Sequence, residues 1–392
     1  MLSAFPARMA YGMVGLSVFF KAEQQTDSIA FAGLAVGLNG LAGALTAGIR
    51  GSVTDRWGMK WPLRILVPGY TFMLIALNMS HDRTIIIIFA VLLGLSAPPI
   101  NLSVRPLWKD AVPEEWLRTA YAVDTAVMST AGVLGPIFAT ALALSAHPGS
   151  ALVVTAIAMF IGGNALNMIP ITRNWKPEPK PADKQPMWRH RPFQLLLIEG
   201  SFIGFGWGVF DVAVPAFATM EEVPHRTAWV FTAMGISNII GGLLGGLVSK
   251  NHSPLKAIRT GYLFWFAASL PIAFTYPGWS MVIAGAFLGL TGGVIQVFYW
   301  EVTEAVRPQG AQSAMLGWLW TVEGSISSLG AASAGWLTTQ FSPQLTLALT
   351  TVCIGLGLLI LNLGKGVLSA ADHIPTKEED LAAMEDNAPT TR

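Results

Sequence analysis

The sequence predicts an all-α membrane protein whose twelve transmembrane helices form two related halves of six. Three observations carry this prediction: an apolar composition, twelve apolar runs of helix length, and an internal repeat. Hydrophobic residues make up 53% of the 392-residue chain and charged residues only 12%, whereas a typical soluble protein has about 25% charged residues. Because so few charges cannot cover a water-soluble surface of this size, the chain is expected to lie in a lipid bilayer.

Each apolar run is long enough to cross the hydrocarbon core of a bilayer as a helix, which takes about 20 residues. The predicted spans are residues 3–20, 28–49, 63–80, 84–104, 119–144, 150–171, 193–219, 226–248, 258–276, 279–300, 311–338 and 344–364. The first run lacks a basic leader and a cleavage site of small residues, so we expect a retained helix rather than a signal peptide.

The internal repeat relates the two halves by a constant offset of 195 residues. Shifting the sequence by this amount superimposes Gly40 on Gly235, Gly51 on Gly246, Arg64 on Arg259, Gly94 on Gly289 and Gly135 on Gly330. One glycine match is weak in a glycine-rich chain, but a constant offset over several spans indicates two parallel six-helix halves.

The predicted organisation follows from the spans and from the composition between them. A first six-helix bundle covers residues 1–171 and a second covers residues 193–365. The segment 172–192 is rich in proline and charge, which predicts an extended linker. The polar segment 366–392 is expected to be a disordered tail.

The basic residues predict the orientation. With the N-terminus inside, the loops and the tail on that side hold 20 of the 24 Lys and Arg residues. Loops rich in Lys and Arg stay in the cytoplasm. We therefore expect a multi-pass protein of the cytoplasmic membrane with the linker and both termini on the cytoplasmic side.

A short charged segment, GSVTDRWGMK, separates the second and third spans. Gly51 and Gly58 would let two helix ends approach and reverse direction. Asp55 is placed to face the positively polarised N-terminus of a neighbouring helix, while Arg56 and Lys60 can reach carboxylates or lipid phosphates.

This segment resembles the helix 2–helix 3 signature of the major facilitator superfamily, G-x-x-x-D-R-x-G-[RK]-[RK]. Five positions match and Met59 stands where a basic residue is usual. The resemblance implies two six-helix bundles, a substrate site between them near the bilayer midplane, and alternating access. It also implies a conformational latch at the cytoplasmic face, in which Asp55 and Arg56 engage the start of span 11 and Arg105 or nearby carboxylates. The equivalent segment of the second half has Lys250 opposite Asp55, so we expect the latch mainly in the first half.

Ionisable residues at membrane depth are costly, so each is a candidate for substrate or proton binding. Glu323 lies about 18 Å from the cytoplasmic end of span 11, at 1.5 Å per residue. Glu199 and Asp211 lie in span 7 with Trp207, and the resemblance places this span beside the cavity. For each carboxylate the alternative is a static or interfacial role.

Further candidates lie in spans 1, 2, 4, 5 and 10. Arg8 and Asp124 are predicted to form a buried pair, with Arg105 as an alternative partner of Asp124. Three uncharged polar residues at cavity depth could bind substrate or bond helices together: Asn39, Asn101 and Gln296. Trp300, at the end of span 10, is expected to be an aromatic anchor at the membrane surface.

Two family patterns match only in part. Gly135 and Pro136 match the helix 5 motif of exporters, which predicts a kinked helix packed tightly between the halves, although Ala131 replaces one of its glycines. The arginine that proton-coupled drug antiporters of the superfamily carry in helix 4 is replaced by Ala90. If protons are coupled, a carboxylate such as Glu323, Asp124 or Glu199 would therefore have to carry them.

The predicted function is secondary active transport: proton-coupled export of a small amphiphilic or drug-like compound. The expected partners are this compound, protons and the lipid bilayer; the chain is expected to act as a monomer. Proton-coupled uptake of a metabolite, a lipid flippase and a non-transporting receptor remain alternatives. A net charge of +1 gives no nucleic-acid footprint, and Cys353 alone excludes a cysteine-cluster metal site. No arrangement typical of an enzyme is visible, and no cofactor is expected.

Overall fold

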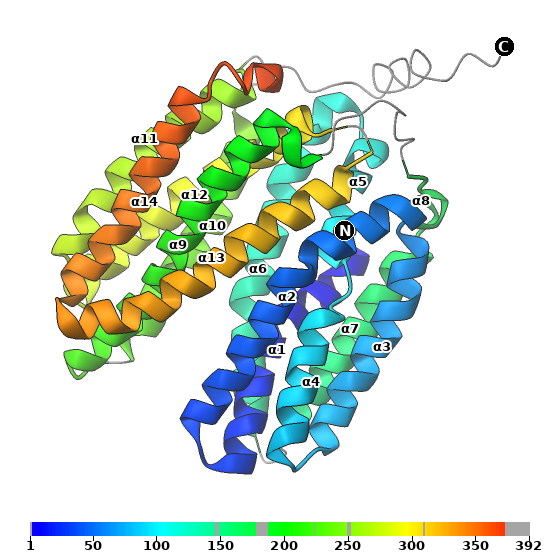
Figure 1. Ribbon diagram of the computed structural model, residues 1–392, viewed down its shortest axis with the longest axis vertical. Helices are drawn as coiled ribbons and strands as arrows, with labels where there is room; N and C mark the ends of the chain where they lie inside the picture. Colours follow the sequence, from blue (N-terminus) through cyan, green and yellow to red (C-terminus); the bar gives the residue numbers. More distant parts are fainter. Residues whose placement is uncertain are drawn as a thin grey trace.

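The computed structural model describes residues 2–145, 149–177, 187–223, 225–248, 252–308 and 310–372. Every regular element within these ranges is a helix, which confirms the predicted fold class (Figure 1). The long helices are α1 (Phe5–Thr26), α2 (Ile29–Trp57), α3 (Lys60–Met79), α4 (Arg83–Leu95), α5 (Ile100–Ala111), α6 (Leu117–Ala143), α7 (Ser150–Met168), α9 (Arg191–Met220), α10 (Arg226–Leu247), α11 (Pro254–Ser269), α12 (Trp279–Val306), α13 (Gln312–Gln340) and α14 (Pro343–Leu363).

Ten helical segments of the described chain are long and apolar enough to cross a membrane, with α4 and α5 counted as one. The other two predicted spans form α1 and α13, of 22 and 29 residues. These two carry ionisable side chains within the helix, including Arg8 in α1 and Glu323 in α13. The chain is thus a multi-pass membrane protein with twelve spanning segments.

The charged segment after the second predicted span is largely helical. α2 continues through Trp57, so Gly51, Asp55 and Arg56 lie on its last turns rather than in a turn between helices. The helix ends at Gly58, whose φ of 79° favours glycine. The end of the molecule at Gly58 is called here the motif end, and the opposite end, where α1 meets α2 at Asp27, the far end.

The fourth predicted span is broken in the middle. α4 ends at Leu95 and α5 begins at Ile100, with Pro98 and Pro99 between them. Proline cannot donate a backbone hydrogen bond and disfavours helix in the residue before it, so two consecutive prolines interrupt the helix despite the apolar sequence.

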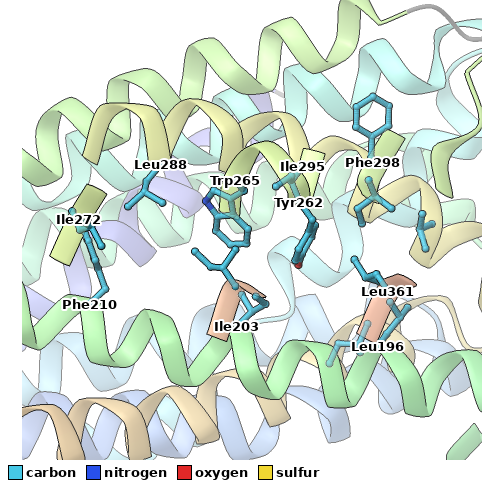
Figure 2. Close-up of a cluster of buried hydrophobic side chains, with 14 of the residues drawn as sticks. Leu196, Ile203, Phe210, Tyr262, Trp265, Ile272, Leu288, Ile295, Phe298 and Leu361 are labelled. Carbon is cyan, nitrogen blue, oxygen red and sulfur yellow. The ribbon is translucent and has the colours of Figure 1, made fainter. Parts of the chain in front are cut away.

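Each half has its own hydrophobic core. In the first half, buried side chains of α1, α3 and α7 pack together, among them Val18, Leu74 and Met159. In the second half, Figure 2 shows Phe210 of α9, Trp265 of α11 and Leu288 of α12 in one layer between the helices. Two separate cores are what two packed bundles require.

The predicted repeat is visible in equivalent helix contacts. A Cβ atom at Gly94 in α4 would collide with the backbone of Asn39 in α2. A Cβ atom at Gly289 in α12 would collide with the backbone of Met234 in α10. Both residues of the second contact lie 195 positions after those of the first, so the close packing of two helix pairs is repeated between the halves.

The halves are joined at the motif end and diverge toward the far end (Figure 1). The joining contacts pair α2 with α13 and α6 with α10, and α5 also touches α13. A third buried cluster covers this junction, with Leu102 and Leu117 from the first half and Val297 and Leu316 from the second. The junction is therefore a packed apolar interface as well as a polar one.

Two predicted segments differ from expectation at their edges. Leu368 and Ala371 are buried in the core of the second half, so residues 366–372 belong to that bundle and not to a disordered tail. The short helix formed by Ser369–Asp372 contacts α11 and α12. Of the predicted linker, Thr172 lies buried in the short helix α8 (Pro170–Asn174). Residues 178–186 and 373–392, and Lys250, lie outside the described residues.

Candidate functional site: the junction and cavity between the halves

The first contact between the halves is a carboxylate at a helix N-terminus. Asp55 is 4% exposed and accepts hydrogen bonds from the backbone N–H groups of Ser313 (2.9 Å) and Ala314 (2.7 Å). These groups belong to the first turn of α13, where four N–H groups have no partner within the helix. The prediction that Asp55 faces the N-terminus of a neighbouring helix is confirmed. We call this contact the α2–α13 seam.

Glycine brings the two backbones of this seam together. A Cβ atom at Gly51 would collide with the carbonyl of Ser313, and one at Gly48 with the ring of Trp318. The N–H of Gly48 donates to the hydroxyl of Thr321 (2.9 Å). The helices could not approach this closely with larger residues at these positions.

The basic residues of the motif lie outside the seam. Arg56 is exposed, and among the described residues it forms no ion pair. The Lys60 ammonium lies 5.7 Å from the ring centroid of Trp61. The expected latch is present only in part: Asp55 engages the start of α13, and Arg56 does not. Arg105, the further partner expected for the latch, is buried in α5, where it shares the carboxylate of Asp124 with Arg8.

The second contact between the halves uses a buried cation. Arg118, in the first turn of α6, forms hydrogen bonds of 2.7 and 2.9 Å with the carboxylate of Glu301 in α12. It also donates to the backbone carbonyls of Val248 and His252, at the end of α10 and just beyond it (3.2 Å each). Nearer the middle of the helices, the Ser129 hydroxyl bonds to Asn238 (2.6 Å). We call this contact the α6–α10 seam.

The predicted ion pair of Arg8 and Asp124 is present, and the alternative pair forms as well. Asp124 accepts from Arg8 (2.8 Å) and from Arg105 (3.4 Å), and all three side chains are no more than 3% exposed. Arg8 also donates to Asn101 (3.0 Å). Two arginines therefore share one carboxylate, which leaves the network with an excess positive charge inside the first half.

A cavity of about 410 Å³ lies where the halves meet; it is lined mainly by α9, α11, α12 and α13 of the second half, and the first half contributes Asn101 and Met128. Five sequence-predicted residues line it: Asn101, Glu199, Trp207, Gln296 and Glu323. Asn101 and Gln296 are the repeat-related pair, and they lie on opposite halves of the molecule. The structure thus brings together two residues that lie 195 positions apart in the sequence.

The two carboxylates of this cavity have little to neutralise them. Glu199 is 1% exposed and accepts a hydrogen bond from the hydroxyl of Tyr262, while its second oxygen has no hydrogen-bond partner. Glu323 has no hydrogen-bond or ion-pair partner among the described residues. Figure 2 shows Tyr262 between the ribbons of α12 and α9, with its hydroxyl toward α9.

Aromatic rings form the rest of the wall. Besides Trp207, the lining includes Tyr262, Trp265, Tyr299, Trp300 and Trp320. The expectation that Trp300 anchors at the membrane surface is wrong: its ring is 6% exposed and lies 3.0 Å from the guanidinium carbon of Arg105. Trp300 thus stands between a buried cation and the cavity. The environment of Trp300 includes Arg105 from another helix, and a hydropathy profile does not indicate such a contact.

Other predicted residues lie outside this cavity. Asp211 is exposed and lines none of the described cavities, and Asn39 donates to the carbonyl of Ala90 (2.9 Å) beside a smaller cavity. Pro136 lies inside the continuous helix α6. A Cβ at Gly135 would collide with Gly12 of α1, so this glycine packs within the first half rather than between the halves.

Sequence reasoning missed several residues of the junction and the cavity: Tyr262, Trp265, Asn238, Glu301 and Arg118. Of these residues, Glu301 could have been selected from the sequence, because this carboxylate directly follows the apolar run of the tenth span. The described residues contain no group of three His, Cys, Asp or Glu side chains that could hold a metal ion. The arrangement offers charge and aromatic surface for binding rather than a nucleophile or a metal centre.

Comparison with known proteins extends these observations. The family model of the Major Facilitator Superfamily matches residues 1–330. An uncharacterised MFS-type transporter of Sinorhizobium fredii is 23% identical over 87% of this chain and 88% of its own length. The multidrug efflux pump Tap of Mycobacterium tuberculosis is 22% identical over 72% of each chain.

A solved structure agrees with the fold. The human organic anion transporter MFSD10 superimposes with a TM-score of 0.73, covering 92% of this chain and 97% of its own, at 13% sequence identity. The match of the family model over most of the chain, together with two six-helix bundles around a shared cavity, leads to one conclusion: the chain belongs to the major facilitator superfamily.

Proposed function

We propose that this transporter exports a small organic cation in exchange for protons. The observation that carries the proposal is the cavity between the halves, where Glu199 and Glu323 lie among aromatic rings and neither forms an ion pair with a residue that the structure describes. Aromatic faces and carboxylates attract cations, and the attraction is stronger where water is excluded. A flat, amphiphilic cation would satisfy both features of this wall.

Exchange with protons follows from competition at the same carboxylates. A bound cation favours ionised Glu199 and Glu323, and protonation removes the charge that holds the cation. Two-state transport requires only that cation and proton bind with different relative affinities in the two conformations.

The latch completes the proposed cycle. In the structure the motif end is joined by the two seams, so the cavity is separated from that end by packed side chains. If the basic end of the protein faces the cytoplasm, as positively charged loops do, this conformation is closed to the cytoplasm. Loss of the two seams would open the cavity to that side, and both termini would lie there.

Two considerations favour export over the alternatives. The relative in Mycobacterium tuberculosis is named a multidrug efflux pump, and a polar, carboxylate-bearing cavity suits a cation better than a lipid. Uptake by a symporter and lipid flipping would use the same fold, and they differ in the sign of coupling and in the ligand. The likeness to MFSD10 concerns the fold alone and does not extend its substrate to this chain.

The test is binding of ethidium to the purified full chain in lipid nanodiscs, followed by fluorescence. We expect saturable binding that weakens as the pH falls, and a loss of about ten-fold or more in Glu323→Gln and in Glu199→Gln, since each removes a charge from a desolvated site. Glu115→Gln is the matched control, because Glu115 is exposed near the start of α6 and lines no described cavity.

Two results would contradict the proposal. One is ethidium affinity that stays unchanged in both glutamine variants while their folding, measured by thermal denaturation, is intact. The other is absence of saturable binding for ethidium, tetraphenylphosphonium and berberine alike, since these cations differ in shape but share the predicted chemistry.

A further inference from the structure

The smaller cavity of the first half has a different chemistry from the one between the halves. It measures about 230 Å³ and lies beside the break between α4 and α5. Its polar side chains are contributed by Tyr11, Asn39, Arg50, Tyr70 and Asn101, and neither Asp nor Glu is among the residues that line it. Arg50 is therefore the only charged side chain of this wall.

Arg50 turns toward the middle of the molecule instead of toward its nearest end. The residue lies seven positions before the end of α2 at Trp57, about 10 Å along a helix axis. An arginine at this depth would ordinarily extend its guanidinium to the membrane surface. Here the guanidinium reaches back to the carbonyl of Gly43, 2.6 Å away and seven positions deeper in the helix.

The broken helix accounts for this orientation. At the end of α4 the backbone carbonyls have no helical partner, and at membrane depth such groups must find one. Arg50 donates to the carbonyl of Ala97 (2.5 Å), and the hydroxyl of Tyr11 donates to the carbonyl of Pro98. A third bond joins Arg50 to the carbonyl of Thr46 (3.3 Å). The guanidinium is thus fixed at the cavity wall by backbone groups.

These bonds leave the positive charge uncompensated. Three of the five N–H donors of a guanidinium are used, and all three contact neutral carbonyls. Within the described part of the chain, Arg50 has no ion pair with a carboxylate. A fixed arginine with two unused donors, in a cavity whose other side chains are all uncharged, is the arrangement that binds a planar anion.

We propose that this cavity is a binding subsite for the carboxylate group of an organic ligand, with Arg50 as the anchoring residue. The rings of Tyr11, Tyr70 and Trp320 would contact the apolar part of the ligand. Gly40 contributes to the open volume of this cavity, because a Cβ atom at this position would have no neighbour within 4 Å. The subsite does not require the proposed cation site, because no lining carboxylate is shared between them.

The subsite adjoins the cavity between the halves. Asn101 and Trp320 line both cavities. A ligand that carried a cationic group and a carboxylate could therefore reach Glu323 on one side and Arg50 on the other. The substrate class of the transporter then includes zwitterionic amphiphiles, and the carboxylate part can be tested separately.

The test is saturation-transfer NMR of benzoate with the full chain in lipid nanodiscs, which reads the weak affinity expected of a small probe. We expect saturable binding of benzoate, about ten-fold tighter than that of uncharged benzamide, because the charge-assisted hydrogen bonds to Arg50 are lost with the amide. Arg50→Gln should lose about the same factor, and Arg50→Lys should retain part of the affinity.

A second variant separates binding from folding, since Arg50 also stabilises the break. Gly40→Leu leaves Arg50 intact and fills the cavity, so it should abolish benzoate binding. Gly37→Leu is its matched control, because Gly37 lies on the same helix with open space around it and does not line the cavity. Ethidium binding should persist in Arg50→Gln and in Gly40→Leu.

Benzoate binding that equals benzamide binding, or that survives in both Arg50→Gln and Gly40→Leu, would overturn the subsite. Absence of saturable benzoate binding to the unmodified chain would overturn it as well. Because the ethidium experiment reports on Glu199 and Glu323, failure of the proposed cation site and failure of this carboxylate subsite give distinguishable results.

Discussion

The two seams between the halves occupy equivalent places and use opposite charges. In the α2–α13 seam, the carboxylate of Asp55 accepts from N–H groups at the start of α13. In the α6–α10 seam, the guanidinium of Arg118 donates to a carbonyl at the end of α10. Each arrangement is favourable because a helix is positive at its N-terminus and negative at its C-terminus.

This difference indicates what the repeat preserves. Gly51 and Gly246, 195 positions apart, both lie where the other half approaches closely: a Cβ at Gly246 would collide with Ala122 of α6. The close approach of the helices is repeated, whereas the charges that secure it are not. Each seam can therefore be broken by a substitution that leaves the other intact, which makes their contributions measurable.

The same two distances, one at each end of the molecule, report whether the seams are closed or open. In a Cys353→Ala background, spin labels at Trp61 and Lys256 report the motif end, and labels at Met79 and Trp279 report the far end. All four side chains are exposed, and each pair joins the two halves. Opening of the motif end should lengthen the first distance and shorten the second, measured by pulsed electron paramagnetic resonance.

Arg118→Gln should have the largest effect. Removing one partner of a buried ion pair costs about 3 kcal/mol or more, which is roughly a hundred-fold in an equilibrium constant. The motif-end distance should shift to the open population. Combining it with Glu301→Gln should restore part of the closed population, since the unpaired carboxylate is then removed. A distance distribution identical to that of the unmodified chain would mean that this seam does not hold the halves.

Asp55→Asn should have a smaller effect. An amide retains one acceptor but loses the charge, and hydrogen bonds to charged groups contribute about 1.5–3 kcal/mol, so we expect roughly a ten-fold shift toward the open motif end. Ethidium transport should fall while expression is unchanged.

The matched control for this change is Asp82→Asn. Asp82 accepts from the N–H groups of Thr84 (2.8 Å) and Ile85 (3.1 Å) at the start of α4, so it makes the same kind of contact within one half. It should leave both distances in place. Equal effects of the two substitutions would indicate a general loss of stability and would refute a specific role of Asp55 at the seam.

Ser129→Ala should have the smallest effect. It removes one neutral hydrogen bond, to Asn238 (2.6 Å), worth about 1 kcal/mol. The ratio of closed to open molecules should decrease a few-fold. Thr130→Ala, which removes a hydroxyl bonded to the carbonyl of Ala126 in its own helix (2.8 Å), should not change it. If Thr130→Ala shifts the distances as much as Ser129→Ala, the bond between the halves contributes nothing.

The sequence was informative where a local signal determines the structure. Apolar runs of membrane length identify the spans, because the lipid core imposes one length on all of them. Asp55 could be assigned to a helix N-terminus because a carboxylate between two glycines at a helix end has few other favourable partners. Glu199 and Glu323 could be selected because a carboxylate within an apolar run is costly unless it has a function or a partner.

The sequence was uninformative where the interaction partner of a residue lies in a distant segment of the chain. Arg50 was counted among the basic residues near the membrane surface, yet the break at Pro98 turns it inward. Hydropathy records that residues 84–104 are apolar, not that two prolines leave carbonyls without partners. Trp300 was misassigned for a related reason: an aromatic residue at the end of a span is common at the surface. Here residues of other helices hold Trp300 in the junction, among them Arg105 of α5 and Trp320 of α13.

The measurement that tests the central claim most directly is ethidium transport in proteoliposomes that contain the full chain. With an acidic interior, exchange for outgoing protons predicts that ethidium accumulates inside, that reversing the gradient prevents this, and that Glu323→Gln and Glu199→Gln abolish it. Movement of ethidium in the same direction as protons, or accumulation that persists in both variants, would contradict the account.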